Sequence, residues 1–156
     1  MNKKKIAHLL CATYVGGLST LSLASIQKPV TIKQEEKIID KKLYAFIGDK
    51  YIANVIAQSK YPYTLAAIAK VESNFRPRII GDKGKSFGLY QIQSRYHGAF
   101  PETVEGQTKY CEQILEKLFR QYPYEQAIER YNGKGHKARQ YRQKVMVAMN
   151  EIRSIQ

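Results

Sequence analysis

Apolar and polar residues alternate with a helical period along most of the chain. Apolar side chains recur three or four positions apart, which predicts amphipathic helices. We expect helices over about 34–47, 50–61, 63–74, 105–121, 124–131 and 138–155. Prolines and glycines fall between these segments, and no strand pattern of useful length appears. The sequence therefore predicts an all-α, or nearly all-α, single domain.

The third of these helices carries a carboxylate among apolar residues. Glu72 shares one stripe with Leu65 and Ile68 at helical spacing. Burying a charged carboxylate is costly, so burial raises its pKa toward the range that a general acid needs. The alternative interpretation is an ordinary helix-end carboxylate paired with Lys70 or Arg76. Glu72 is the first candidate for catalysis.

A loop punctuated by glycines follows this helix. Residues 75–87 are expected to be irregular, 88–93 to open another short helix, and 94–103 to form a loop. Asp82 is the one other acid between Glu72 and Glu102. We interpret it as a turn residue, because aspartate often bonds its own backbone in turns. The alternative is a second catalytic carboxylate, as conventional glycosidases require.

The N-terminal segment resembles a secretory signal. Three lysines at positions 3–5 precede an apolar run rich in small residues, which ends near Ala24. Residues 1–24 are expected to be a signal peptide, with an uncleaved membrane anchor as the alternative. Residues 25–44 would be a linker and the start of the first helix, and 45–156 the domain. The expected location is the periplasm or cell envelope of a bacterium.

The chain is strongly basic. Its formal net charge is +13, and three of the lysines lie in residues 1–24, which contain no acid. Such a balance favours a polyanionic partner, and export disfavours nucleic acid. A basic cluster near the last helix is expected to be a solvated face; the alternative is steering toward anionic glycan or a membrane surface. This cluster consists of Lys134, Lys137, Arg139, Arg142 and Lys144.

Cysteine and histidine provide little evidence for chemistry. Cys11 lies in the expected targeting segment, so Cys111 has no expected disulfide partner and is interpreted as a small core residue. His97 and His136 have no ligand-like spacing with each other or with Cys111. We expect no metal and no cofactor.

Several short motifs in a fixed order carry a family resemblance. They resemble the soluble lytic transglycosylase catalytic domain, a branch of the lysozyme-like superfamily, over about residues 60–150. The motifs are Glu72–Pro77, Gly84, Gly88–Ile92 and Ala127–Gly133, with Tyr141 and Val145 resembling the family's closing tyrosine helix. Two positions depart from the common pattern, since Gly81 replaces a frequent serine and Tyr90 a frequent methionine.

The resemblance implies a specific chemistry. Glu72 would be the sole catalytic acid and base, cleaving the bond between N-acetylmuramic acid and N-acetylglucosamine. The muramic C6 hydroxyl would attack the anomeric carbon, which leaves a 1,6-anhydro end. Five further residues would line the sugar groove or lie beside the glutamate: Ser86, Gln91, Tyr131, Asn132 and Tyr141.

The same resemblance implies partners and alternatives. The partners would be peptidoglycan strands and, by analogy alone, a secretion, conjugation or pilus apparatus served by a monomeric accessory enzyme. A lysozyme-type hydrolase of the same fold is one alternative. A catalytically silent glycan-binding or assembly factor is another, and a cationic membrane-active protein is the most distant.

Overall fold

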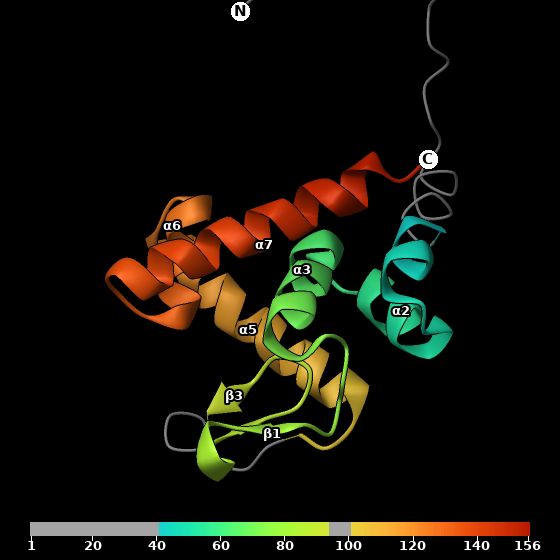
Figure 1. The fold of residues 1–156 in the computed structure, drawn as a ribbon, viewed down its shortest axis with the longest axis horizontal. Helices are drawn as coiled ribbons and strands as arrows, with labels where there is room; N and C mark the ends of the chain where they lie inside the picture. The colour runs from blue at the N-terminus through green and yellow to red at the C-terminus, as the bar shows by residue number, and fades with distance from the viewer. Residues whose placement is uncertain (1–40, 94–100) are drawn as a thin grey trace, which may run out of the picture.

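The computed structural model describes residues 41–93 and 101–156, and these residues form a mainly helical domain around a central helix, α3 (Figure 1). Residues 41–47 are helical as well. The longer helices are α2 (Lys50–Ala57), α3 (Pro62–Ser73), α5 (Val104–Gln121), α6 (Tyr124–Asn132) and α7 (His136–Ser154). The predicted fold class, mostly α and lysozyme-like, is confirmed.

Helix α3 is buried nearly all round, as its sequence predicted. Pro62 occupies its first turn, where the missing N–H costs nothing, and Asn74 ends it in the left-handed conformation. Residues 65–69 have no exposed surface. In Figure 1, α7 crosses one side of α3 and α5 the other, and α3 packs against α2, α5 and α7. The carboxyl end of α3, which carries Glu72, therefore emerges from the buried core.

The last two helices close the core against α3. The predicted core face of α7 is confirmed, because Tyr141, Val145, Ala148 and Ile152 are all buried. Gly133 joins α6 to α7 with a φ of 117°, a region that side chains disfavour. The tight reversal at this glycine brings α6 and α7 side by side, where they make extensive contact.

Three very short strands form a small antiparallel sheet after α3. They are β1 (Ile80–Gly81), β2 (Ser86–Phe87) and β3 (Ile92–Gln93), paired in that order, with a 3₁₀ turn over Asp82–Gly84. The helix expected over 88–93 is wrong: these residues form a tight turn and then β3. The φ angles of Gly88 (78°) and Gln91 (45°) are positive, which a right-handed helix cannot accommodate. Two-residue strands are too short to produce an alternating pattern.

A buried amide holds this turn against α5. The Oε1 atom of Gln107 accepts a hydrogen bond from the Leu89 N–H at 2.8 Å. Its Nε2 donates to the backbone oxygens of Pro77 and Glu102 at 3.0 and 3.3 Å. A Cβ added at Gly88 would lie 2.3 Å from Gln107 Oε1, so the close approach requires glycine. One side chain thus ties three loop segments to the helical core.

Several expectations fall on residues outside the described ranges. The targeting segment with Cys11, the linker and the segment with His97 are among them. Cys111 lies within the described part and is buried, as predicted. No helix within 41–93 or 101–156 combines the length and apolar character needed to cross a membrane.

Candidate active site

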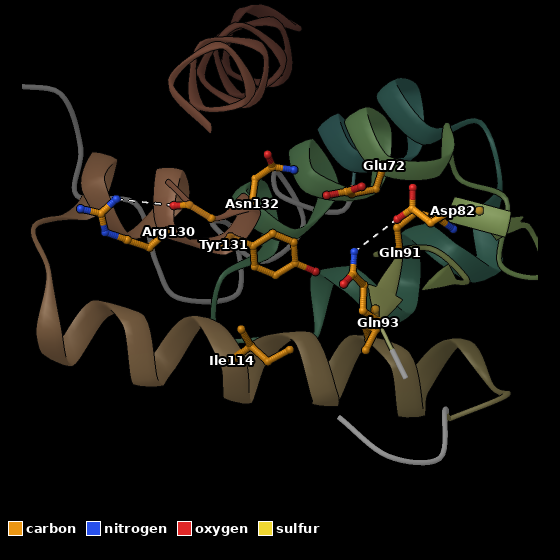
Figure 2. A pocket seen from close by; sticks show the side chains of 11 residues that line it. Glu72, Asp82, Gln91, Gln93, Ile114, Arg130, Tyr131 and Asn132 are labelled. Atoms are coloured by element: carbon orange, nitrogen blue, oxygen red, sulfur yellow. Dashed lines mark hydrogen bonds between the residues drawn. The ribbon is translucent and has the colours of Figure 1, made fainter. Parts of the chain in front are cut away.

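A cavity of about 730 Å³ lies between the small sheet and helices α3, α5 and α6 (Figure 2). Its volume falls in the range typical of sites for small ligands. It is lined by Glu72, Gly81, Asp82, Gln91, Ile92, Gln93, Ile114, Arg130, Tyr131, Asn132 and Gly133. The structure therefore brings four of the six predicted site residues to one cavity: Glu72, Gln91, Tyr131 and Asn132.

Glu72 is a desolvated carboxyl in the last turn of α3. Burial raises its pKa from 4.5 to about 7, an effect that the Tyr141 hydroxyl opposes and the charge of Asp82 reinforces. Within the described residues, no lysine or arginine forms an ion pair with it. Lys70 instead donates to Asn74 and Arg76 to the backbone oxygen of Ser73. The ion-paired interpretation of Glu72 therefore has no support in this structure.

Tyr141 approaches Glu72 from α7. Its hydroxyl is buried and has no partner at hydrogen-bonding distance and angle among the described residues. It nevertheless lies close enough to Glu72 to lower the pKa of that carboxyl. Burial holds the pKa of Tyr141 well above its usual value, and Glu72 raises it further. The hydroxyl thus stays protonated and is available to donate to the Glu72 carboxylate.

Tyr131 forms the floor beside the catalytic candidate. Its ring stacks on Tyr141 with centroids 6.2 Å apart, and its hydroxyl donates to the Tyr90 backbone oxygen at 2.8 Å. The Cys111 thiol donates to the same hydroxyl at 3.5 Å. Burial raises the pKa of Cys111, so the thiol remains protonated and unreactive. The Tyr131 hydroxyl is consequently engaged by the protein, while the residue also lines the cavity.

Gln91 presents its side chain from the tight turn before β3. Its Nε2 donates to the backbone oxygens of Gly88 at 3.0 Å and Ile79 at 3.3 Å. The Oε1 atom lies over Gly81, where an added Cβ would be only 2.0 Å away. Glycine at position 81, in place of the family's frequent serine, therefore leaves the space that this amide occupies.

Asp82 lies in a turn, as predicted, but its side chain also reaches the cavity. It lines the cavity with Glu72, and its Oδ2 atom accepts hydrogen bonds from Ser86 Oγ and from Gln93 Nε2, the latter at 3.3 Å. Ser86 itself is buried behind Asp82 and does not line the cavity. Ser86 therefore holds the Asp82 carboxylate through a hydrogen bond and does not itself reach the cavity.

Sequence reasoning did not single out several residues at the cavity. Gln93 lies two positions after Gln91, and Arg130 directly precedes the Tyr131-Asn132 pair, so both lay beside recognised motifs. Ile114, three positions after the buried Cys111 on α5, is partly exposed and forms part of the cavity wall (Figure 2).

A known protein family matches the part of the chain that forms the cavity. The model of the family described as the transglycosylase SLT domain matches residues 51–152, from α2 to the last turns of α7. The match includes all residues that line the cavity. No curated protein and no solved structure matches the chain. Because the matched segment covers well over half of its length, the chain belongs to the transglycosylase SLT domain family.

Proposed function

We propose that this protein is a peptidoglycan lytic transglycosylase in which Glu72 acts first as the acid and then as the base. Family membership supports lytic transglycosylase-type activity on peptidoglycan. The observation that carries the proposal for Glu72 is its state: a desolvated carboxyl at a cavity, without a cationic partner in the described ranges and with a pKa of about 7. Such a group is protonated in part at neutral pH and can work in both directions.

The proposed reaction needs one carboxyl group and no water. Protonated Glu72 gives its proton to the glycosidic oxygen as the bond from the muramic anomeric carbon to that oxygen breaks. The resulting carboxylate then takes the proton of the muramic C6 hydroxyl, whose oxygen bonds to the anomeric carbon. The products are a free N-acetylglucosamine hydroxyl and a 1,6-anhydromuramic end, with the enzyme back in its starting protonation state.

The other predicted site residues would position the sugars or tune the acid. Gln91 offers its amide oxygen and Asn132 its amide to hydroxyl and acetamido groups, and the Tyr131 ring offers a flat surface against a sugar. Tyr141 would donate to Glu72 once it is ionised, because hydrogen bonds of this kind tighten in the bound complex. Ser86 would act through Asp82, whose carboxylate it holds.

A lysozyme-type hydrolase is the second candidate, and the position of Asp82 favours it. Two carboxyl groups facing one cavity are what a hydrolytic glycosidase requires, and Asp82 is close enough to raise the pKa of Glu72. In that reaction Asp82 would activate water or stabilise the charged intermediate. Under the transglycosylase reaction, Asp82 has only an electrostatic role.

The products of digestion separate these candidates. Purified peptidoglycan is incubated with the wild type, Glu72→Gln and Asp82→Asn, and the fragments are identified by mass spectrometry. We expect anhydro ends from the wild type, a loss of roughly 100- to 10,000-fold with Glu72→Gln, and residual anhydro products with Asp82→Asn. Reducing ends that require Asp82 would instead support the hydrolase. Binding without cleavage by folded wild type would indicate a silent glycan-binding factor.

Peptidoglycan as the substrate implies a place of action in the cell envelope. Export by the N-terminal segment would deliver the protein there, and residues 1–40 lie outside the described part of the chain. A role beside a secretion, conjugation or pilus apparatus, the monomeric state and membrane-surface association stay predictions.

A further inference from the structure

The cavity is electrically polarised along its length. In Figure 2, Glu72 and Asp82 lie at one end, Arg130 lies at the other, and Tyr131 and Asn132 lie between them. The sugar backbone of peptidoglycan is uncharged, so its cleavage does not by itself require a cation so far from the acid. The position of Arg130 therefore suggests that it binds a part of the substrate other than the reacting sugars.

The protein holds the Arg130 side chain in place but does not provide acceptors for all of its N–H donors. Its Nη1 donates to the Gly133 backbone oxygen at a long 3.5 Å, and the guanidinium lies 5.6 Å above the Tyr122 ring. Its Nε is buried without a hydrogen-bond partner among the described residues. A guanidinium has five N–H donors in a fixed fork. The Tyr122 ring orients this guanidinium, and protein acceptors do not engage all of its donors.

The surrounding acids do not neutralise this end of the cavity. Glu129 lies 3.7 Å from Arg130 Nη1, but it also lies 3.8 Å from Arg142, which in turn faces Glu125 at 3.7 Å. These two acids thus face two arginines. Lys134, Lys137 and Arg139 are exposed just beyond, at the turn and the start of α7. The local balance is positive, which favours an anionic ligand group.

We propose that Arg130 binds a carboxylate of the peptide stem carried by the muramyl residue, and so gives the enzyme a preference for peptide-bearing strands. This inference rests on the proposed function, which puts a muramyl residue beside Glu72. Stem peptides contain free carboxylates, and the guanidinium fork matches a carboxylate in a bidentate pair. The cation at one end of the cavity and the acid at the other would fix the direction in which the strand lies.

The test compares cleavage of three glycan substrates by the full chain. They are strands with free stem carboxylates, strands from which an amidase has removed the peptide and whose exposed lactyl carboxyl is then capped as an amide, and strands whose stem carboxylates are amidated. The amidated strands are made in three preparations, at the glutamate α-carboxyl, at the remaining positions, or at all of them. We expect the wild type to show kcat/KM about tenfold higher on free-carboxylate strands than on stripped ones, as a charge-assisted contact would give. The amidation that removes this preference identifies which carboxylate is bound.

Variants separate a direct contact from a structural or a general charge effect. Arg130→Gln should lose the preference, because its kcat/KM should fall more on free-carboxylate strands than on stripped ones, and Arg130→Lys should retain only part of the preference because the fork is lost. Lys144→Gln removes the same charge from an exposed site on α7 and should retain the full preference. Thermal unfolding of each variant confirms that it is folded.

Distinct outcomes would overturn the inference. An unchanged preference in Arg130→Gln, or an equal loss on stripped and peptide-bearing strands, would show that Arg130 does not recognise a stem carboxylate. A preference that survives when all stem carboxyls are amidated would exclude carboxylate recognition. Cleavage of all substrates at equal rates by the wild type would refute the peptide preference alone, whereas no cleavage of any substrate would refute the proposed function as well.

Discussion

The two walls of the cavity are built on different physical principles. The wall that carries Glu72 is helical, and apolar packing of α3 against α2, α5 and α7 holds it. The facing wall, residues 74–93, contains only two-residue strands and one 3₁₀ turn. All five described non-glycine residues with positive φ lie there: Asn74, Phe75, Asp82, Lys83 and Gln91. Its shape depends on individual hydrogen bonds from Gln107, Ser86 and Gln91.

This difference assigns different tasks to the two walls. The helical wall removes water from Glu72 and so determines its pKa. The loop wall positions Asp82 and the Gln91 amide, and its hydrogen bonds hold them at defined points. Substitutions in the helical wall should therefore change protonation and pH dependence. Substitutions in the loop wall should change stability and substrate contacts.

The largest expected effect concerns the stability of Glu72→Gln. The folded pKa of Glu72 is about 7, above its ordinary 4.5, so the wild type loses stability as pH rises from about 4.5 to 7. Glutamine cannot ionise, and the variant should gain about 3 kcal/mol relative to the wild type across this range. Urea unfolding at pH 4 and pH 8 measures the gain. Glu151→Gln, an exposed change on α7, is the control; an equal gain there would refute the desolvation of Glu72.

The next effect tests the hydrogen-bonded loop wall. Gln107→Met keeps the side-chain volume but leaves the Leu89 N–H and two backbone oxygens without their amide partner. We expect a loss of about 2–3 kcal/mol in the free energy of unfolding, together with weaker glycan binding. Gln113→Met makes the same change on the exposed face of α5 and should cost less than about 0.5 kcal/mol. Equal costs at the two positions would show that the loop wall does not depend on Gln107.

The smallest effect is a pair of opposite shifts in pH dependence. The Tyr141 hydroxyl lowers the pKa of Glu72, and the Asp82 charge raises it. If protonated Glu72 is the acid, activity declines as pH rises through its pKa. Tyr141→Phe should then move this decline to higher pH, and Asp82→Asn should move it to lower pH. Profiles of kcat/KM against pH measure both, and shifts in the same direction would contradict the assigned contacts.

Much of the helical wall could be predicted from the sequence, and much of the loop wall could not. The period of 3.6 residues placed Glu72 on the apolar face of α3 and Tyr141 on the core face of α7, and both positions agree with the structure. The helix expected over 88–93 is wrong, because the conformations of Gly88 and Gln91 depend on Gln107 and on sheet pairing. We interpreted Asp82 as a turn residue because nothing nearby in the sequence links it to Glu72.

The sequence by itself determined which segments become helices and which carboxylate lies on a buried stripe, because periodicity and helix ends are local properties. Only the tertiary structure decided what surrounds that carboxylate. The sheet places Asp82 beside Glu72, α7 brings Tyr141 to it, and α6 places Arg130 at the far end of the cavity. The raised pKa and the polarity of the cavity follow from contacts between residues far apart in the chain, which no local pattern contains.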